Sequence, residues 1–338
     1  MPLIYGFYRI HLFLSRMQKF LIIQTAFLGD VILATPVANA LREKYPDAQI
    51  DMLVRKGNES LVQGHYALDN VLIWNKKEGK YKSLRALKKQ IVAEKYTEII
   101  NLHRFASSGF LTAFGKAENS VGFDKNPLSF LFKKKVKHDL TQNLHEVERN
   151  LSLIAHHGVP KKMRPSLHPA EKDFAFVNKF KGQKYVCFAP ASVWFTKQMP
   201  KEKWIELGHT MNHKIYLIGG PGDVALCEEI AQELDNAEVL AGQLNLMQSA
   251  ALIKDAQHSY VNDSGPMHIS SAMNTPTTAF YCSTVPEFGF GPLAEQSRII
   301  SKSLDCKPCG LHGHKACPKG HFDCGFKLDF KKDVYLDS

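Results

Sequence analysis

The sequence lacks any apolar run long enough to cross a bilayer as a helix, which takes about 20 consecutive apolar residues. It also lacks a secretion signal: residues 3–14 are apolar and aromatic, but Arg9 and His11 interrupt them and no small-residue cleavage site follows. The glycine-rich turn at 219–223 does not have the G-x-G-x-x-G spacing, and no G-x-x-x-x-G-K-[ST] sequence occurs. These absences argue against a membrane-spanning protein, a dinucleotide-dependent enzyme and a P-loop NTPase.

We interpret residues 1–18 as an N-terminal extension from an upstream start codon, because Met17 is followed almost directly by an apolar strand. The alternative is an anchor that lies at a membrane interface. Without a secretion signal, the seven cysteines are expected in a reducing, cytoplasmic compartment.

The 338 residues are 44% hydrophobic and 22% charged, an ordinary composition for a globular protein of two domains. With 43 Lys and Arg against 33 Asp and Glu, the formal net charge is +10. This charge indicates an anionic partner, such as nucleic acid, a phosphorylated metabolite or an anionic membrane surface. Nucleic acid is disfavoured, because no recognised binding module is present and the basic residues are mostly dispersed.

Strand and helix patterns alternate twice along the chain. In the first half, the patterns predict strands at 20–24, 49–54, 71–74 and 98–102 and helices at 31–44, 84–94 and 144–157. In the second half, they predict strands at 185–189, 214–218, 256–261 and 277–281 and helices at 201–211, 224–234 and 246–256. We therefore expect an α/β protein of two doubly wound parallel-sheet domains, at 19–160 and 176–338, with a linker at 161–175.

The segment 262–268, Asn-Asp-Ser-Gly-Pro-Met-His, lies between a strand and a helix. Free backbone N–H groups and the positive end of the helix dipole make such a turn an anion site. We expect a diphosphate there, bound by Asp263, Ser264, Gly265, Met267 and His268. The alternative is a capped turn with a core histidine.

A corresponding turn in the first half ends at Gly29 and Asp30. Asp30 is interpreted either as a helix cap or as a general base at the mouth of a cleft between the domains. In the second half, Ser192 and Lys197 follow a strand, where a lysine can neutralise a phosphate; the alternative is a solvated lysine. Asp223 is either a ribose contact or another helix cap.

Four cysteines gather near the C-terminus, at positions 306, 309, 317 and 324. The Cys-x2-Cys half favours a structural zinc site formed by Cys306, Cys309, Cys317 and Cys324, although reduced cysteines or a disulfide are the alternative. The segment 127–138 places aromatic residues beside four lysines, among them Lys133, Lys134 and Lys135. It is either a solvated face or a contact for an anionic amphiphile at a membrane surface.

These motifs resemble glycosyltransferase family 9, the bacterial lipopolysaccharide heptosyltransferases. The resemblance rests on FLGDVILATP at 27–36, VGFD at 121–124, HEVERN at 145–150, the 190–197 loop and NDSGPMHISSA at 262–272. It implies a GT-B fold, an ADP-heptose donor and an inverting transfer to the inner core on Kdo–lipid A. It also implies a cytoplasmic enzyme peripheral to the inner membrane, with no cofactor required for catalysis.

The resemblance assigns roles to individual residues. Asp30 matches the family's proposed base, Ser192 and Lys197 match donor-diphosphate contacts, and Asp223 falls near an acidic ribose contact. An acceptor-side lysine of many relatives is absent, and Arg104 is expected to replace it. Gly29, Arg104 and Lys133–Lys135 are the expected acceptor contacts. The rival interpretations are a transferase for another nucleotide sugar and a non-catalytic nucleotide-sugar-binding relative.

Overall fold

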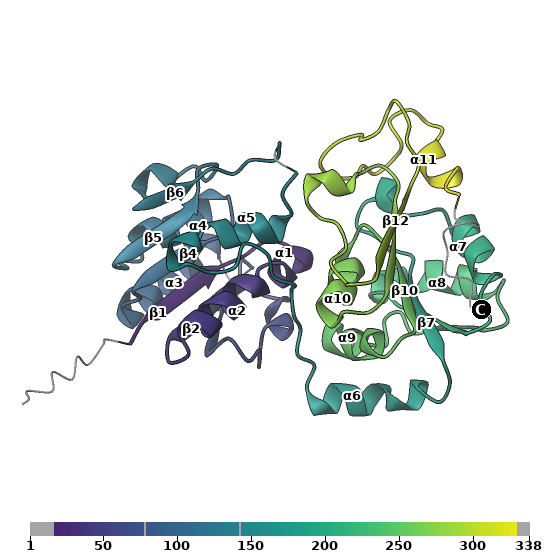
Figure 1. Cartoon of the computed structure of the whole chain (residues 1–338), viewed down its shortest axis with the longest axis horizontal. Coiled ribbons are helices and arrows are strands. Elements are labelled where there is room, and N and C mark those ends of the chain that lie inside the picture. The colour runs from purple at the N-terminus through teal and green to yellow at the C-terminus, as the bar shows by residue number, and fades with distance from the viewer. Residues whose placement is uncertain (1–16, 78, 142, 330–338) are drawn as a thin grey trace, which may run out of the picture.

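The computed structural model describes residues 17–77, 79–141 and 143–329, so most of the interpreted extension at 1–18 lies outside the described residues. The chain forms two α/β domains that lie side by side (Figure 1). The two domains repeat one strand order, since the first sheet runs β3-β2-β1-β4-β5-β6 and the second β12-β11-β10-β7-β8-β9. All paired strands are parallel. The predicted pair of doubly wound parallel sheets is therefore confirmed.

The first domain contains β1 to β6 and α1 to α5. Its strands are β1 (Lys19–Ile23), β2 (Gln49–Arg55), β3 (Asn70–Trp74), β4 (Glu98–Asn101), β5 (Asn119–Phe123) and β6 (Lys134–Val136). Its α-helices are α1 (Leu28–Ile32), α2 (Thr35–Lys44), α3 (Lys80–Glu94), α4 (Ala106–Phe114) and α5 (Glu146–Ser152). Short 3₁₀ turns are η1 (Glu59–Leu61), η2 (Ser129–Leu131) and η3 (Ala155–His157).

The second domain contains β7 to β12 and α6 to α11. Its strands are β7 (Tyr185–Ala189), β8 (Lys214–Leu217), β9 (Ala237–Val239), β10 (His258–Asn262), β11 (Thr277–Tyr281) and β12 (Ser297–Ser301). Its α-helices are α6 (Glu171–Val177), α7 (Lys201–Gly208), α8 (Val224–Ala231), α9 (Leu246–Lys254), α10 (Gly265–Met273) and α11 (Asp323–Phe326). Its 3₁₀ turns are η4 (Asn178–Phe180), η5 (Phe195–Lys197), η6 (Pro221–Asp223) and η7 (Pro286–Phe288).

The central strands are buried along almost their whole length because helices cover both faces of each sheet. Four of the five residues of β1 and all five residues of β7 are buried. One apolar cluster continues from the first domain, through Val31 of α1, to Met267 of α10 in the second. Among the described residues, no helix is long and apolar enough to cross a membrane.

Pro36 divides the helix predicted at 31–44 into α1 and α2. Proline has no N–H to donate to the carbonyl of Ile32, four residues earlier. The Thr35 hydroxyl donates to that oxygen instead, at 2.8 Å. The break separates α1, which carries Asp30, from the long helix behind it.

Candidate active site

The two domains meet where α1 of the first approaches the N-terminal end of α10 in the second. A Cβ atom placed on Gly29 would lie 2.7 Å from Cδ2 of His268, and one placed on Gly265 would lie 2.7 Å from Cδ1 of Leu28. Real side chains do not approach so closely, so glycine at both positions is what permits this contact. Both turns follow the carboxyl ends of central strands, where ligands bind in sheets of this kind. The two turns predicted to carry chemistry therefore lie in contact across the domain boundary.

Asp30 is the third residue of α1 and directly follows Gly29, which contacts His268. Its Oδ2 accepts a hydrogen bond from the backbone N–H of Phe27, at 3.1 Å. Burial, with a smaller contribution from the nearby carboxylate of Glu146, raises the pKa of Asp30 to about 6, against the opposing effect of Arg104. Asp30 thus caps α1, and its raised pKa suits a general base near neutral pH, a role that stays a prediction.

Arg104 reaches the same region from the loop after β4. Asn126 holds this loop, because its Nδ2 donates to the carbonyls of His103, at 3.1 Å, and Phe105, at 3.0 Å. Burial lowers the pKa of His103 to about 4, and the positive charges of Lys76, Arg104 and Arg55 lower it further. Three cations therefore act on one neutral histidine at the carboxyl edge of the first sheet: Arg55 ends β2, and Lys76 and Arg104 lie in the loops after β3 and β4.

Lys197 and Asp263 form an ion pair in the second domain. Lys197 Nζ lies 2.7 Å from Asp263 Oδ2, and the Thr284 hydroxyl donates to the same carboxylate oxygen at 2.6 Å. An ionised carboxylate has no proton to donate to a phosphate, whereas an ammonium has three. This geometry makes Asp263 a residue that orients Lys197 and leaves Lys197 as the group suited to an anion.

His268, the fourth residue of α10, is buried beside the turn. Burial lowers its pKa to about 3, despite the nearby carboxylate of Asp263, so the ring is neutral at any working pH. Its Nδ1 has no hydrogen-bond partner among the described residues. A buried polar atom without a partner is unusual and points to a ligand or water at that position.

The remaining predicted donor contacts lie around the same turn or along the same sheet edge. Ser264 precedes α10 in an extended conformation, and the N–H of Met267 donates to its carbonyl at 3.2 Å. The carbonyl of Ser192 accepts a hydrogen bond from Gln198, at 2.5 Å. One oxygen of Asp223 accepts from the N–H of Gly220, at 2.7 Å, which is the capping role we considered for it.

The three acceptor-side lysines lie elsewhere. Lys134 is the first residue of β6, and Lys133 precedes it, so both are at the amino end of an edge strand. Lys133 donates to the backbone carbonyl of Glu118 at that end of the sheet. Lys134 contributes to the electrostatics of His156 rather than to those of Asp30. The structure therefore groups Arg104, but not Lys133–Lys135, with the candidate base.

The HEVERN segment at 145–150 joins the two domains. No role was predicted for its individual residues. The N–H of Glu146 donates to the carbonyl of Gly289 at 2.7 Å, Arg149 Nη2 donates to Phe288 at 2.8 Å, and His145 Nε2 donates to Gly291 at 3.0 Å. We call residues 144–149 and 288–291 the domain latch.

The domain latch also acts on the candidate base through its charge. Glu146 is buried, pairs with Arg149 Nε at 2.8 Å and acts on the pKa of Asp30. Asn150 donates to the carbonyl of Leu33 at 3.1 Å, just beyond α1. The available sequence signal was a pair of opposite charges three positions apart, Glu146 and Arg149, which is the spacing of neighbours on one face of a helix.

The cysteine-rich segment packs over the loop that carries Lys197. The N–H of His314 donates to Thr196 Oγ1 at 2.8 Å, and the N–H of Thr196 donates to the carbonyl of His314 at 3.1 Å. In a tetrahedral zinc site the sulfurs lie about 4 Å apart. Among the described residues, no three ligand atoms from this segment lie within 4.8 Å of one another. The four thiols of this structure are therefore too far apart for a closed zinc site. The predicted zinc site is untested and stays a prediction.

Comparisons with known proteins agree on one family. The model of glycosyltransferase family 9 (heptosyltransferase) matches residues 84–319. Lipopolysaccharide heptosyltransferase 3 of Escherichia coli is 31% identical over 281 residues, which cover 76% of this chain and 82% of that protein.

Solved structures show the same fold. The structure of E. coli ADP-heptose lps heptosyltransferase II is similar with a TM-score of 0.74 and 21% identity, covering 90% of this chain and 97% of the other. An E. coli heptosyltransferase with ADP-2-deoxy-2-fluoro heptose has a TM-score of 0.71 and 20% identity, with coverages of 86% and 97%. The predicted GT-B architecture is confirmed.

Proposed function

The chain belongs to glycosyltransferase family 9, and from this premise we propose that it transfers heptose from ADP-heptose to the inner core of lipopolysaccharide, with inversion at the anomeric carbon. One observation carries the proposal: Asp30, a carboxylate with a raised pKa, directly follows Gly29, and Gly29 contacts His268 in the first turn of α10. The related heptosyltransferase with an ADP-heptose analogue supports the choice of donor.

The donor diphosphate binds at the N-terminal end of α10 and to Lys197. The ammonium of Lys197 has three donors, so it can hold Asp263 and a phosphate oxygen together. The neutral ring of His268 can donate a further hydrogen bond from Nδ1. We expect contacts to the diphosphate from Ser192, Ser264, Gly265 and Met267, and a contact to the ribose from Asp223.

The acceptor binds against the first domain. Phe27, Phe105 and Phe130 are 64%, 67% and 70% exposed, and they follow β1, β4 and β5. The guanidinium of Arg55 lies over the Phe27 ring, 4.7 Å from its centre. Exposed rings beside Arg55 and Arg104 suit a lipid-linked, anionic saccharide held at the cytoplasmic face of the inner membrane, with the enzyme as a peripheral protein.

Asp30 accepts the proton of the attacking hydroxyl while that oxygen displaces the nucleoside diphosphate. A single displacement by an oxygen on the opposite face inverts the anomeric carbon. Negative charge grows on the departing diphosphate, and the α10 N–H groups with Lys197 are already oriented to stabilise it. Because these groups take up the charge, we expect no divalent cation in the chemical step.

Product analysis tests this proposal. Purified protein is incubated with ADP-heptose and a truncated lipopolysaccharide, and mass spectrometry should show the acceptor gaining one heptose. Binding of ADP without transfer would refute the catalytic proposal. Transfer from UDP- or GDP-linked hexoses instead would keep the enzyme and replace the donor, which is the alternative that family membership leaves open.

A further inference from the structure

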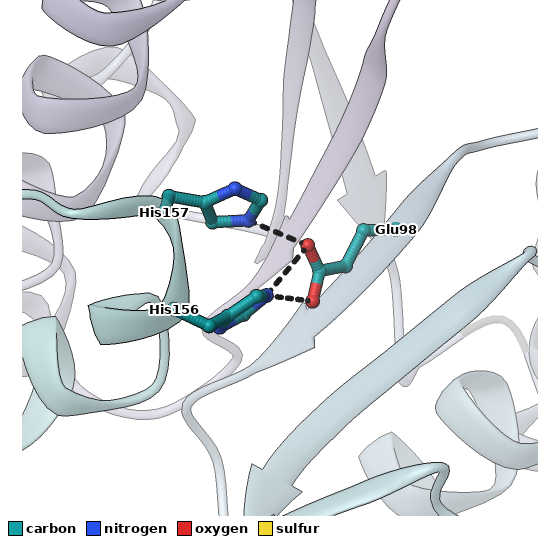
Figure 2. A group of neighbouring side chains, drawn as sticks. All are labelled: Glu98, His156 and His157. Carbon is teal, nitrogen blue, oxygen red and sulfur yellow. Dashed lines mark hydrogen bonds and ion pairs between the residues drawn. The ribbon is translucent and has the colours of Figure 1, made fainter.

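A second group of polar side chains lies at the end of the first sheet that faces away from Asp30. Glu98 is the first residue of β4, at the amino end of the strand, whereas Arg104 follows its carboxyl end. His156 and His157 come from η3, the short turn that follows α5. Figure 2 shows both imidazole rings pointing at the carboxylate of Glu98.

Ligand atoms from the three residues converge. His156 Nε2 lies 3.0 Å from Oε1 and 3.3 Å from Oε2 of Glu98, and His157 Nε2 lies 2.7 Å from Oε2 (Figure 2). One carboxylate oxygen and two ring nitrogens lie within 4.8 Å of one another, and no other trio of His, Cys, Asp or Glu does so in the part of the chain that the structure describes.

The charge of Glu98 has little compensation from the protein. Its side chain is 3% exposed, and its ion-pair partners among residues 17–77, 79–141 and 143–329 are the two histidines. A buried carboxylate without a full compensating charge is unfavourable, and a divalent cation between it and the two rings would supply that positive charge.

A further contact orients one ring. His157 Nδ1 lies 2.9 Å from the hydroxyl oxygen of Tyr45. The ring also packs edge-on against Tyr45 and Phe20, with ring centres 5.4 Å and 5.5 Å apart. If Nδ1 donates to the Tyr45 oxygen, the lone pair of Nε2 points toward Glu98. Metal-bound histidines are usually fixed in this way.

We propose that Glu98, His156 and His157 form a binding site for a divalent transition-metal ion, and zinc suits this ligand set best. The His156 side chain is 31% exposed, which gives the ion a path from solvent and leaves a coordination position for water. The site is remote from Asp30, so the ion would link β4 to η3 and strengthen the first domain rather than take part in sugar transfer.

Calorimetric titration with zinc chloride tests the site on the full chain after treatment with a chelator. The double variant Cys306→Ser/Cys309→Ser is the background, because the C-terminal thiols are a separate candidate for zinc. We expect one zinc per chain in this background and a rise in Tm of about 5 °C at a hundredfold excess over Kd. Cobalt should give weak visible absorption without the strong near-ultraviolet band of thiolate ligands.

His156→Ala and Glu98→Gln should each abolish binding, whereas His209→Ala, which removes an exposed histidine of the second domain, should keep it. His156→Ala is informative even if Glu98→Gln fails to fold, because the His156 side chain is partly exposed. No zinc bound in the Cys306→Ser/Cys309→Ser background, or zinc retained by His156→Ala in that background, would overturn the proposal. Neither outcome bears on sugar transfer, because binding and Tm are measured without donor or acceptor.

Discussion

Asp30→Asn separates the catalytic role of this carboxylate from its capping role. Asparagine keeps an oxygen that can accept from the N–H of Phe27, so α1 stays capped. It cannot take a proton from the acceptor, so we expect turnover to fall by about 10²–10⁴. Affinity for the nucleoside diphosphate should change little, because the donor site is in the other domain.

The same substitution should change stability in a pH-dependent way. The folded protein raises the pKa of Asp30 from 3.8 to about 6, so it binds this proton more tightly than the unfolded chain does. Ionisation of Asp30 therefore lowers the free energy of unfolding, with its full effect above pH 6. Below pH 3.8 the carboxyl is protonated in both states and the effect is absent. Two pKa units correspond to about 3 kcal/mol, and solvent screening of this partly exposed group lowers the expected cost to ~1–2 kcal/mol.

Two assays check the reasoning. The wild-type kcat/KM should fall about tenfold per pH unit below pH 6, whereas Asp30→Asn should show a low rate without that decrease. In urea unfolding, the free energy of unfolding of Asp30→Asn should exceed that of the wild type at pH 8. The two values should be equal near pH 4. Asp173→Asn is the control, because Asp173 accepts from the N–H of Ala170 in the same capping geometry outside the cleft. A rate that stays constant down to pH 4 would refute the assignment of Asp30 as the base.

Three further substitutions probe the gap between the domains. Gly29→Ala should reduce turnover by about tenfold or more in a folded protein, because its Cβ would collide with His268, and kinetics with circular dichroism can test this. Lys197→Ala should weaken ADP binding about tenfold or more by calorimetry, because it removes the cation at the anion site. Arg149→Ala should lower stability by ~3–5 kcal/mol in urea unfolding, because Glu146 would stay buried without its partner.

Each of these substitutions has a matched control. Gly182→Ala adds a Cβ where nothing lies within 4 Å, so it should leave turnover unchanged. Lys201→Ala removes an exposed lysine that pairs with Glu229, and ADP affinity should not change. Arg164→Ala breaks an exposed pair with Glu295 and should cost at most about 1 kcal/mol. Equal effects in a variant and its control would point to a general loss of structure instead of the proposed local cause.

The sequence predicted the two sheets because their central strands are continuous apolar runs, which leave a clear pattern. It missed α4 and α6. Residues 171–175 were expected to belong to the linker, yet the Asp173 carboxylate accepts from the N–H of Ala170 and caps the start of α6 there. The edge strands β9 and β12 were also missed, because partly exposed edge strands lack a strong apolar pattern.

The candidate site was predictable as two turns but not as a network of charges. The sequence indicated Lys197 and Asp263 separately, and only the fold shows that they neutralise each other. Glu146 and Asp30 are 116 positions apart, so their electrostatic interaction depends on how α5 packs beside α1. Spacing rules describe neighbours along one element, and they contain no information about such distant pairs.

The position of the domain latch has a consequence for motion. Its hydrogen bonds join the two halves beside the point where Glu146 influences Asp30. If the halves swing apart to admit substrates, the least costly rotation keeps these bonds and turns about them as an axis. Asp30 then travels little and keeps its electrostatic surroundings, whereas rim side chains such as Phe105 and Val193 sweep through the widest arc.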